Sequence, residues 1–255
     1  MTGTLATGCD LVVLCGGLGT RLRPVVSDRP KSMALIDDRP FLDFVLEHFI
    51  RHGVERVVLC TGYRNDVIDA WYRGARRPYE LVISHEASPL GTAGALKQAA
   101  PSITSDPFLV VNGDSLIDID PNELLGFHAL KQGAATVALV EAGARADVGF
   151  VSLDCHGRVA AFAEKRPDAA AKYHNAGLYV FGRDLLEDIP EGCPYAIETD
   201  LLPALLPRGV FGFASAAPLY DIGTPERLAG FRASRRSWST EWLSGRATAG
   251  SSYGS

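Results

Sequence analysis

A glycine-rich segment with clustered cations is the part of the sequence best suited to chemistry. Gly16, Gly17 and Gly19 follow the apolar run DLVVLC, and the chain continues as TRLRP. Glycines allow a tight turn and let backbone N–H groups approach phosphate oxygens without obstruction by side chains. Between Arg21 and Lys31 four cations and one acid give a local charge of +3, whereas the whole chain carries −5. The segment therefore predicts an anion-binding loop directly after a strand.

Two common phosphate-binding loops do not fit this segment. A Walker loop requires GxxxxGK[ST], but Lys31 follows a proline and has no glycine before it. A dinucleotide fingerprint requires GxGxxG, and Leu22 stands where its third glycine belongs. The loop is thus predicted to bind phosphate in another way.

Two carboxylates stand where strands or turns meet a predicted ligand site. Asp114 closes the motif NGD after the apolar run PFLVV, and ligands of open α/β sheets bind at the carboxyl ends of strands. Asp221 precedes a helix start in YDIGTPE. Either motif also suits an ordinary turn, so both interpretations stay open. His48 and His52 have a metal-ligand spacing, but their apolar surroundings and the lack of a third ligand favour two partly buried histidines.

The composition restricts the classes of protein. The chain has 255 residues, of which 47% are hydrophobic and 22% charged, as expected for a globular protein. Its net charge of −5 argues against a general nucleic-acid surface. No apolar run approaches the roughly 20 residues of a membrane helix, and the start lacks the features of a signal peptide. We therefore expect a cytoplasmic protein without nucleic-acid or membrane partners. Five cysteines without a CxxC pair predict free thiols.

Apolar runs alternate with helical patterns in the first half, which is typical of parallel βαβ units. There we expect strands at 10–15, 55–60, 79–84 and 107–111, and helices at 40–52, 65–72 and 92–100. The second half predicts antiparallel hairpins, with strands at 134–141, 149–153, 158–164 and 177–181. After these we expect a helix at 198–206, a strand at 210–216 and a helix at 224–232.

Seven motifs, taken together in their order, are far more specific than any one of them. GGLGTRLRP, PKSM, PLGTAGAL, NGD, EK, NAGLYVF and YDIGTPE resemble those of the sugar 1-phosphate nucleotidyltransferase family over about Leu11 to Phe231. Within the family the sequence is most similar to D-glycero-α-D-manno-heptose 1-phosphate and mannose-1-phosphate guanylyltransferases. The resemblance implies an α/β fold, a Rossmann-like three-layer α/β/α arrangement with a mixed, mostly parallel central sheet and no β-helix domain. It also implies one domain over 1–233, with a nucleotide half at 10–133 and a sugar half at 134–233. The segment 234–255 is expected to be a flexible tail, because seven of its last twelve residues are Ser or Gly.

The resemblance further implies roles for particular residues. Those implied in catalysis are Arg21, Lys31, Asp114 and Lys165. Those implied in nucleotide binding are Leu14, Gly16, Gly17, Gly19, Thr20, Arg21, Glu86, Pro89, Gly91, Thr92, Asn112 and Gly113. Those implied in binding the sugar phosphate are Gly149, Glu164, Lys165, Asn175, Glu198 and Thr199. Asp114 and Asp221 match a pair that holds Mg²⁺. Many relatives have proline after EK, where this chain has Arg166.

The implied reaction is attack by a sugar 1-phosphate oxygen on the α-phosphorus of a nucleoside triphosphate, with release of pyrophosphate. A phosphate monoester is largely a dianion at pH 7, so no general base is required. The Glu86 carboxylate can accept from both N1–H and the 2-amino group of guanine, which favours GTP, although backbone groups can also read the base. The expected partners are the nucleoside triphosphate and the sugar 1-phosphate, and a homo-oligomer is compatible with this prediction.

Three alternatives stay open at this point. One is a thymidylyl-, uridylyl- or adenylyltransferase acting on another hexose or heptose 1-phosphate. Another is a non-catalytic nucleotide-sugar binding protein, against which both lysines and both aspartates argue. The last is a transferase that loads a nucleotide onto a different phosphorylated acceptor, against which Glu164, Lys165 and Asn175 argue.

Overall fold

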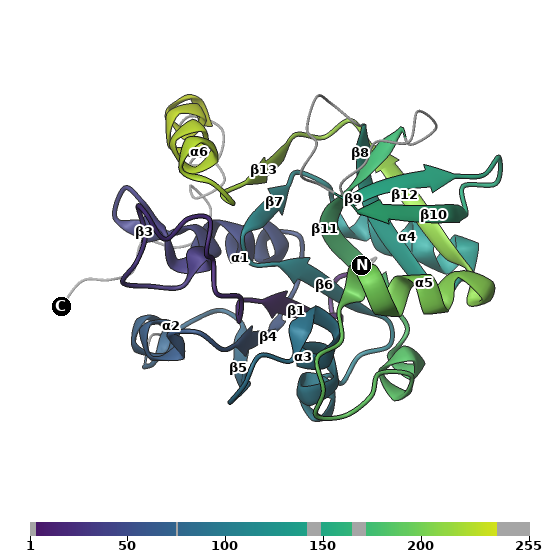
Figure 1. The fold of residues 1–255 in the computed structure, drawn as a ribbon, viewed down its shortest axis with the longest axis horizontal. Coiled ribbons are helices and arrows are strands. Elements are labelled where there is room, and N and C mark those ends of the chain that lie inside the picture. The colour runs from purple at the N-terminus through teal and green to yellow at the C-terminus, as the bar shows by residue number, and fades with distance from the viewer. Residues whose placement is uncertain (1–3, 75, 142–148, 165–171, 239–255) are drawn as a thin grey trace.

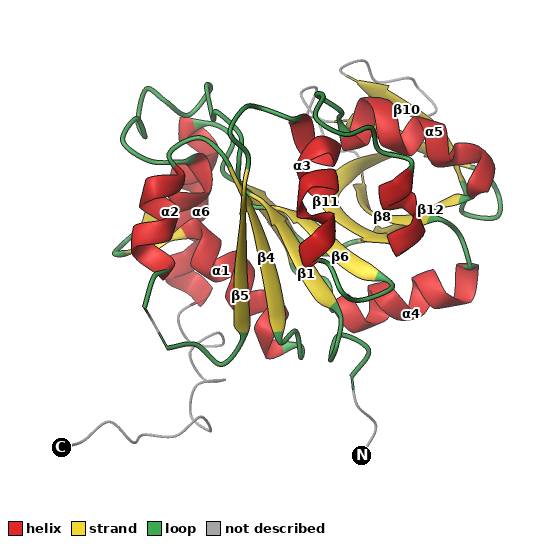
Figure 2. Cartoon of the chain, turned by 90° about the horizontal axis from the view of Figure 1, so that it is seen from below, coloured by secondary structure: helices red, strands yellow, loops and turns green. Residues whose placement is uncertain are grey.

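A mixed β-sheet with helices on both faces forms the frame of the molecule (Figures 1 and 2). The computed structural model describes residues 4–74, 76–141, 149–164 and 172–238. The strands are β1 (Asp10–Leu14), β2 (Leu35–Ile36), β3 (Arg39–Pro40), β4 (Arg56–Thr61), β5 (Glu80–His85), β6 (Phe108–Asn112), β7 (Ser115–Ile117), β8 (Ala135–Glu141), β9 (Gly149–Leu153), β10 (Val159–Glu164), β11 (Tyr173–Phe181), β12 (Val210–Ser215) and β13 (Leu219–Asp221). The α-helices are α1 (Phe41–Arg51), α2 (Asn65–Tyr72), α3 (Gly91–Ala99), α4 (Pro121–Lys131), α5 (Leu202–Leu205) and α6 (Pro225–Trp238).

The main sheet has a parallel part and an antiparallel part. Its order is β10-β9-β11-β6-β1-β4-β5, and β8 pairs with both β11 and β12. The strands β6, β1, β4 and β5 run parallel, whereas β11 joins β6 and β8 in antiparallel register. The predicted hairpin of β9 and β10 is present. β12 pairs with β8 in parallel; the sequence predicted this strand but not its partner.

Two hydrophobic cores lie on the two faces of the sheet, because alternate residues of a buried strand point to opposite sides. Leu11 and Val13 of β1 belong to the core that also contains residues of α1, α2, α4 and α6. Val12 belongs to the core that contains residues of α3 and α5. All three side chains are fully buried. This arrangement, seen edge-on in Figure 2, is the predicted three-layer α/β/α fold.

Several elements differ from the sequence-based prediction. α4 was not predicted; its N-cap is Asp120, whose side chain accepts from the Asn122 N–H at 2.8 Å. The short strands β2 and β3 were not predicted either. The antiparallel pair of β7 and β13 was also missed. α6 starts at Pro225 as predicted but continues past Arg232 to Trp238, so its last turn extends into the segment expected to be a flexible tail.

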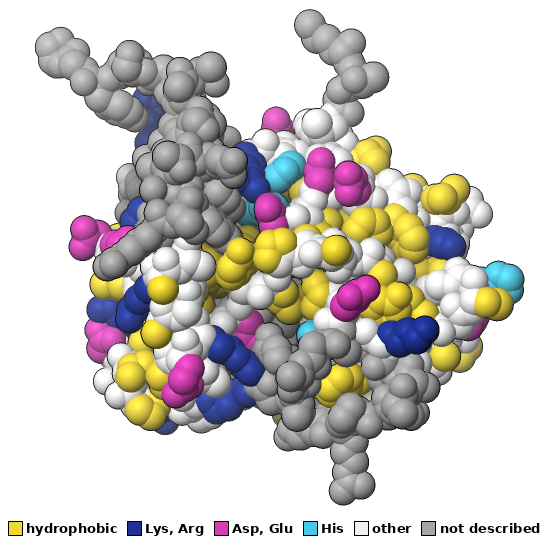
Figure 3. Space-filling model, turned by 90° about the horizontal axis from the view of Figure 1, so that it is seen from above, with side chains coloured by type: hydrophobic (Ala, Val, Ile, Leu, Met, Phe, Trp, Pro, Cys, Tyr) yellow, Lys and Arg dark blue, Asp and Glu magenta, His cyan; other side chains and the backbone are white. Residues whose placement is uncertain are grey.

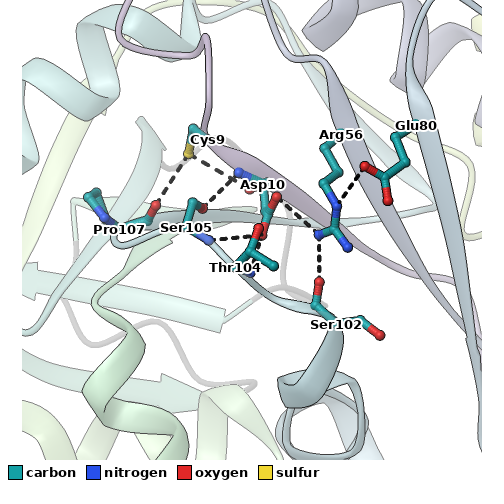
Figure 4. Close-up of polar contacts among 8 residues, drawn as sticks. All are labelled: Cys9, Asp10, Arg56, Glu80, Ser102, Thr104, Ser105 and Pro107. Atoms are coloured by element: carbon teal, nitrogen blue, oxygen red, sulfur yellow. Dashed lines mark hydrogen bonds and ion pairs between the residues drawn. The ribbon is translucent and has the colours of Figure 1, made fainter.

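A buried carboxylate ties the amino end of β1 to neighbouring segments (Figure 4). The Asp10 carboxylate accepts from the backbone N–H groups of Thr104 and Ser105 and pairs with Arg56 at 3.2 Å. Arg56 also pairs with Glu80 at 3.1 Å. Burial disfavours the charged carboxylate, but these hydrogen bonds outweigh it and hold the pKa of Asp10 below its ordinary value. The network holds the sheet together at the end opposite the glycine loop.

We expect Asp10→Asn to lower the free energy of unfolding at pH 7 by about 3 kcal/mol, because it leaves Arg56 without its buried partner. The depressed pKa stabilises the fold above the ordinary carboxyl pKa of about 3.9, and this contribution is lost as pH falls through the folded value. Urea unfolding at pH 7 and at acid pH measures both effects. The gap between wild type and variant should shrink in acid, and Asp66→Asn, which changes an exposed carboxylate, should have little effect.

Candidate active site

A pocket of about 400 Å³ lies at the carboxyl ends of the parallel strands. Its lining includes the predicted nucleotide-binding residues Leu14, Gly16, Gly17, Gly19, Thr20, Arg21, Glu86, Pro89, Gly91, Thr92 and Asn112. Gly113 lies behind the lining, where its N–H donates to the Leu14 carbonyl at 3.0 Å. A Cβ on Gly113 would lie 2.9 Å from Cys15 Sγ, so glycine is required for β6 to end this close to β1. We call this cavity the first pocket.

The glycine loop follows β1 and depends on close backbone approach. A Cβ on Gly16 would lie 2.5 Å from the Glu86 carboxylate, and Gly19 has a φ of +58°. The loop is anchored because the Tyr63 N–H donates to the Gly16 carbonyl at 3.2 Å. The Arg23 guanidinium also lies over the Tyr63 ring, 5.1 Å from its centroid. Tyr63 was not predicted from the sequence, and its position just after β4 at the same sheet edge is the signal that could have found it.

The structure brings Asp221 next to Asp114, which lines the first pocket; Asp221 is not itself part of the lining and lies two residues before the lining residue Gly223. Asp221 on β13 stands opposite Ser115 of β7, the residue after Asp114. The Ile222 N–H donates to the Asp114 carbonyl at 3.1 Å. The Lys31 ammonium pairs with the Asp114 carboxylate, and it would lie 3.2 Å from a Cβ on Gly223. Two acids and a lysine from three separate segments therefore meet beside the glycine loop.

A smaller cavity of about 210 Å³, the second pocket, lies between the antiparallel strands and α5. Its lining residues are Gly149, Phe150, Phe162, Asn175, Glu198, Thr199 and Pro203. Four of the residues predicted to bind the sugar phosphate are therefore together: Gly149, Asn175, Glu198 and Thr199. Glu164 pairs with Gly149 through the backbone of β10 and β9. Lys165 and Arg166 lie outside the described residues.

A buried tyrosine connects two residues of the second pocket. The Asn175 side-chain amide donates to the Tyr179 hydroxyl at 2.7 Å, and that hydroxyl donates to Glu198 at 2.9 Å. The other oxygen of Glu198 accepts from Thr92 of the first pocket at 3.3 Å. Tyr179 is fully buried, and burial raises its pKa well above the ordinary value, so the hydroxyl keeps its proton. The chain of hydrogen bonds joins the two pockets, and Tyr179 was not identified from the sequence.

A bulge in β11 positions Asn175 between the pockets. The register of β11 against β8 shifts between Asn175 and Tyr179. Gly177 has a φ of +73°, and its N–H donates to the Asn175 side-chain oxygen at 2.9 Å. A Cβ on Gly177 would lie 2.7 Å from the Asn112 amide of the first pocket. The glycine thus lets β11 and β6 approach at the point where the pockets adjoin.

If the second pocket holds the sugar 1-phosphate that the resemblance implies, we expect Tyr179→Phe to raise the KM for it about fivefold to tenfold, because Asn175 and Glu198 lose the hydroxyl that fixes them. The KM for the nucleotide should change less than twofold. Steady-state kinetics with each substrate varied in turn measures the two KM values separately. Tyr72→Phe removes a hydroxyl that bonds Asp43 away from both pockets and should leave both constants unchanged. Equal increases in both KM values would indicate a general structural role for Tyr179.

Two buried polar atoms of residues that line the first pocket make no hydrogen bond within the described residues. Ser32 Oγ and Asn112 Oδ1 are buried, and neither has a hydrogen-bond partner among the residues that the structure describes. Such atoms are rare in folded proteins because losing water without a replacement is costly. A polar ligand in the pocket would supply that replacement.

The histidine pair is not a metal site. His48 is fully buried, donates from Nε2 to the Ile119 carbonyl at 2.8 Å, and accepts at Nδ1 from Arg51. Burial lowers the pKa of His48 to about 4, which keeps the ring neutral at pH 7. His52 donates to the His48 carbonyl at 2.7 Å. The prediction of two partly buried histidines is confirmed for His52, whereas His48 is fully buried.

Charge is unevenly distributed over the face seen in Figure 3. Lys and Arg side chains are more frequent on the side of α6 and β3, whereas hydrophobic side chains gather on the side of β8 and β12. The cationic side belongs to the half that contains the glycine loop.

Among the described residues no helix has both the length and the apolar character needed to cross a membrane.

The glycine loop at the end of a parallel strand, the pair of acids and the adjoining second pocket are features of an α/β protein with room for two ligands. The nucleotidyl transferase family model matches residues 11–233. The chain belongs to this family, which confirms the resemblance predicted from the seven motifs.

Particular relatives agree with this placement. The chain is 38% identical over 221 residues to a mannose-1-phosphate guanylyltransferase of Mycobacterium tuberculosis, covering 85% of this chain and 62% of that protein. It is 33% identical over 218 residues to a D-glycero-alpha-D-manno-heptose 1-phosphate guanylyltransferase of Aneurinibacillus thermoaerophilus, covering 85% and 94%. The crystal structure of HddC from Yersinia pseudotuberculosis complexed with GMP-PN matches with a TM-score of 0.79 and 29% identity, covering 89% and 99%. These matches also confirm the predicted fold class.

Proposed function

We propose that the protein is a guanylyltransferase that joins GMP from GTP to a sugar 1-phosphate and releases pyrophosphate. The sugar is proposed to be mannose or D-glycero-α-D-manno-heptose, because both kinds of enzyme are among the relatives. The observation that carries the proposal is the hydrogen bond between Thr92 and Glu198, which joins a pocket containing the glycine loop to a second, mostly apolar pocket whose polar side chains are Asn175, Glu198 and Thr199. A single-ligand binding protein has no need for this second pocket.

The chemical difficulty is to bring two anions together in line. An oxygen of the sugar phosphate forms a bond to the α-phosphorus of GTP, and the bond from that phosphorus to the leaving pyrophosphate breaks. The attacking dianion has no proton to lose, so the protein supplies positioning and charge rather than a base. We assign Arg21 and Lys31, which line the first pocket, to the negative charge on the α-phosphate and pyrophosphate. Lys165 is assigned to the attacking phosphate.

Asp114 and Asp221 suit a hard divalent cation. They offer carboxylate oxygens, the ligands that Mg²⁺ prefers in phosphate-handling sites. Each carboxylate pairs with a cationic side chain, and a divalent cation would share or replace that partner. Mg²⁺, when bound, would neutralise phosphate charge. The sugar would be held by Gly149, Asn175, Glu198 and Thr199, with Glu164 beside them.

Glu86 is proposed to recognise the guanine base. One of its oxygens accepts from the Leu90 N–H at 3.1 Å, and the other lies against the backbone of Gly16 and Gly62. The carboxylate is therefore held in a fixed orientation at the wall of the first pocket. A fixed acceptor is preorganised for the two donors on the edge of guanine.

We expect Glu86→Gln to lower kcat/KM for GTP about tenfold or more, because the new amide turns one acceptor into a donor. The values for ATP and UTP should fall less, so the preference for GTP should narrow. Competition kinetics among triphosphates measures the ratio directly. Glu123→Gln, an exposed change on α4, serves as the control. An unchanged preference would assign base recognition to other groups.

The proposed function is tested by a grid of substrates. Purified protein with Mg²⁺ is assayed for pyrophosphate release with each nucleoside triphosphate and each of several sugar 1-phosphates. We expect the highest rate with GTP and mannose 1-phosphate or the heptose 1-phosphate. Highest rates with UTP, dTTP or ATP would support one of the other nucleotidyltransferases. Nucleotide binding without turnover of any pair would support the non-catalytic alternative.

A further inference from the structure

Arg227 is a cation placed against a carboxylate that the proposed function assigns to the metal. Its guanidinium NH1 lies 3.2 Å from Asp221 Oδ2, and both side chains are largely buried, with 24% and 19% of their surfaces exposed. The Arg227 N–H also donates to Thr224 Oγ1 at 3.4 Å, in the first turn of α6. The start of the helix therefore fixes the backbone from which the arginine reaches the site. The seven motifs gave no reason to single out this residue.

Both oxygens of Asp221 already have donors. Oδ1 accepts from the Gly223 N–H, and Oδ2 accepts from Arg227. The two oxygens of Asp114 are engaged in the same way, by Lys31 and by the Ser115 hydroxyl. A divalent cation that enters between the carboxylates must displace or share these donors.

The positions of Arg227 and Lys31 relative to the first pocket distinguish the effects of their two charges. A Cβ on Gly223 would lie 3.2 Å from Lys31 Nζ and 3.5 Å from the Arg227 guanidinium, so the two cations flank this glycine. Lys31 lines the first pocket and is assigned to the phosphates, whereas Arg227 is not part of that lining. The charge of Arg227 therefore acts mainly on Asp221.

We propose that Arg227 weakens the binding of a divalent cation in the absence of substrate. It competes for Asp221 Oδ2, and its positive charge repels a doubly charged ion a few ångströms away. The phosphates of the nucleotide would offset this repulsion, so the cation binds strongly only together with the triphosphate. The inference rests on the proposed function, because it takes Asp114 and Asp221 as the metal ligands.

The test measures Mn²⁺ binding to the substrate-free protein by electron paramagnetic resonance, which counts the free ion over the millimolar range. We expect Arg227→Gln and the second neutral variant, Arg227→Met, to bind Mn²⁺ about fivefold more tightly than wild type. Arg227→Lys keeps the charge and should bind more weakly than either. Arg232→Gln removes a charge from the same helix, where the arginine contacts the Leu35 carbonyl, and should change affinity less than twofold. Thermal unfolding establishes that each variant is folded.

The outcomes separate this inference from the proposed function. Unchanged or weaker Mn²⁺ binding by both neutral variants would overturn the role of Arg227. A gain in Mn²⁺ affinity in Arg232→Gln as large as that in Arg227→Gln would overturn it too. Asp221→Asn tests the ligand assignment itself. If Asp221→Asn loses Mn²⁺ binding while the neutral variants gain none, only the inference is wrong. If Asp221→Asn binds Mn²⁺ as wild type does, the metal site of the proposed function is wrong.

Discussion

Asp114→Asn should lower kcat about a thousandfold and leave the fold intact. The amide has the shape of the carboxylate but not its charge, so both a proposed metal ligand and the partner of Lys31 are lost. GTP should still enter the first pocket, because the glycine loop and Glu86 are unchanged. Pyrophosphate release in single turnover measures the chemical step, and nucleotide titration measures binding.

The control for this change is Asp118→Asn. Asp118 pairs with Arg51 at 3.1 Å and does not line either pocket. This variant should turn over at nearly the wild-type rate. A nearly normal kcat in Asp114→Asn would remove Asp114 from the reaction, whereas a loss of thermal stability would show that its pairing with Lys31 is structural.

Lys31→Gln should lower kcat/KM about a hundredfold or more. The ammonium is proposed to stabilise charge on the triphosphate in a pocket that excludes much of the water, where such an interaction is strong. The lysine is positioned by the short helical turn Lys31–Met33 and by contact of its Cβ region with Gly19. Steady-state kinetics at fixed Mg²⁺ concentration gives the change.

The matched control for Lys31 is Lys131→Gln. Lys131 is a half-buried lysine at the end of α4 that donates to the His156 carbonyl and does not line either pocket, so its loss removes the same charge away from the site. Its kcat/KM should stay within about twofold of wild type. If both lysine variants fall equally, the effect comes from net charge rather than from the site.

The parallel part of the fold was predictable because its signals are local. β1, β4 and β6 are short apolar runs that end in turn residues, and α1 is closed by a glycine. α4 was missed although Asp120 and Pro121 form a good helix start. Its buried residues Leu124, Leu125 and His128 do form a helical stripe, but Leu130, which is exposed, adds an apolar residue outside it and blurs the pattern. The parallel pairing of β12 with β8 depends on contacts between distant segments, which local patterns do not encode.

The candidate site likewise contains residues that the sequence could identify and residues that it could not. The glycine loop and Asp114 follow strands, and the ends of parallel strands meet at one edge of the sheet, so their proximity could be predicted. Tyr179 and Arg227 could not be identified because their importance comes from partners on other segments. Tyr179 resembles any buried aromatic residue in a strand until Glu198 is placed beside it. Arg227 resembles an ordinary residue of a helix start until its contact with Asp221 is known.

The central claim is that Asp114 and Asp221 together hold a divalent cation beside the glycine loop. It is tested most directly by a crystal structure with Mn²⁺ and α,β-methylene GTP, whose bridging carbon blocks the release of pyrophosphate. We predict an anomalous peak in contact with both carboxylates and the phosphates, with the guanine against Glu86. A nucleotide bound in the first pocket with the Mn²⁺ peak away from both aspartates would contradict the account.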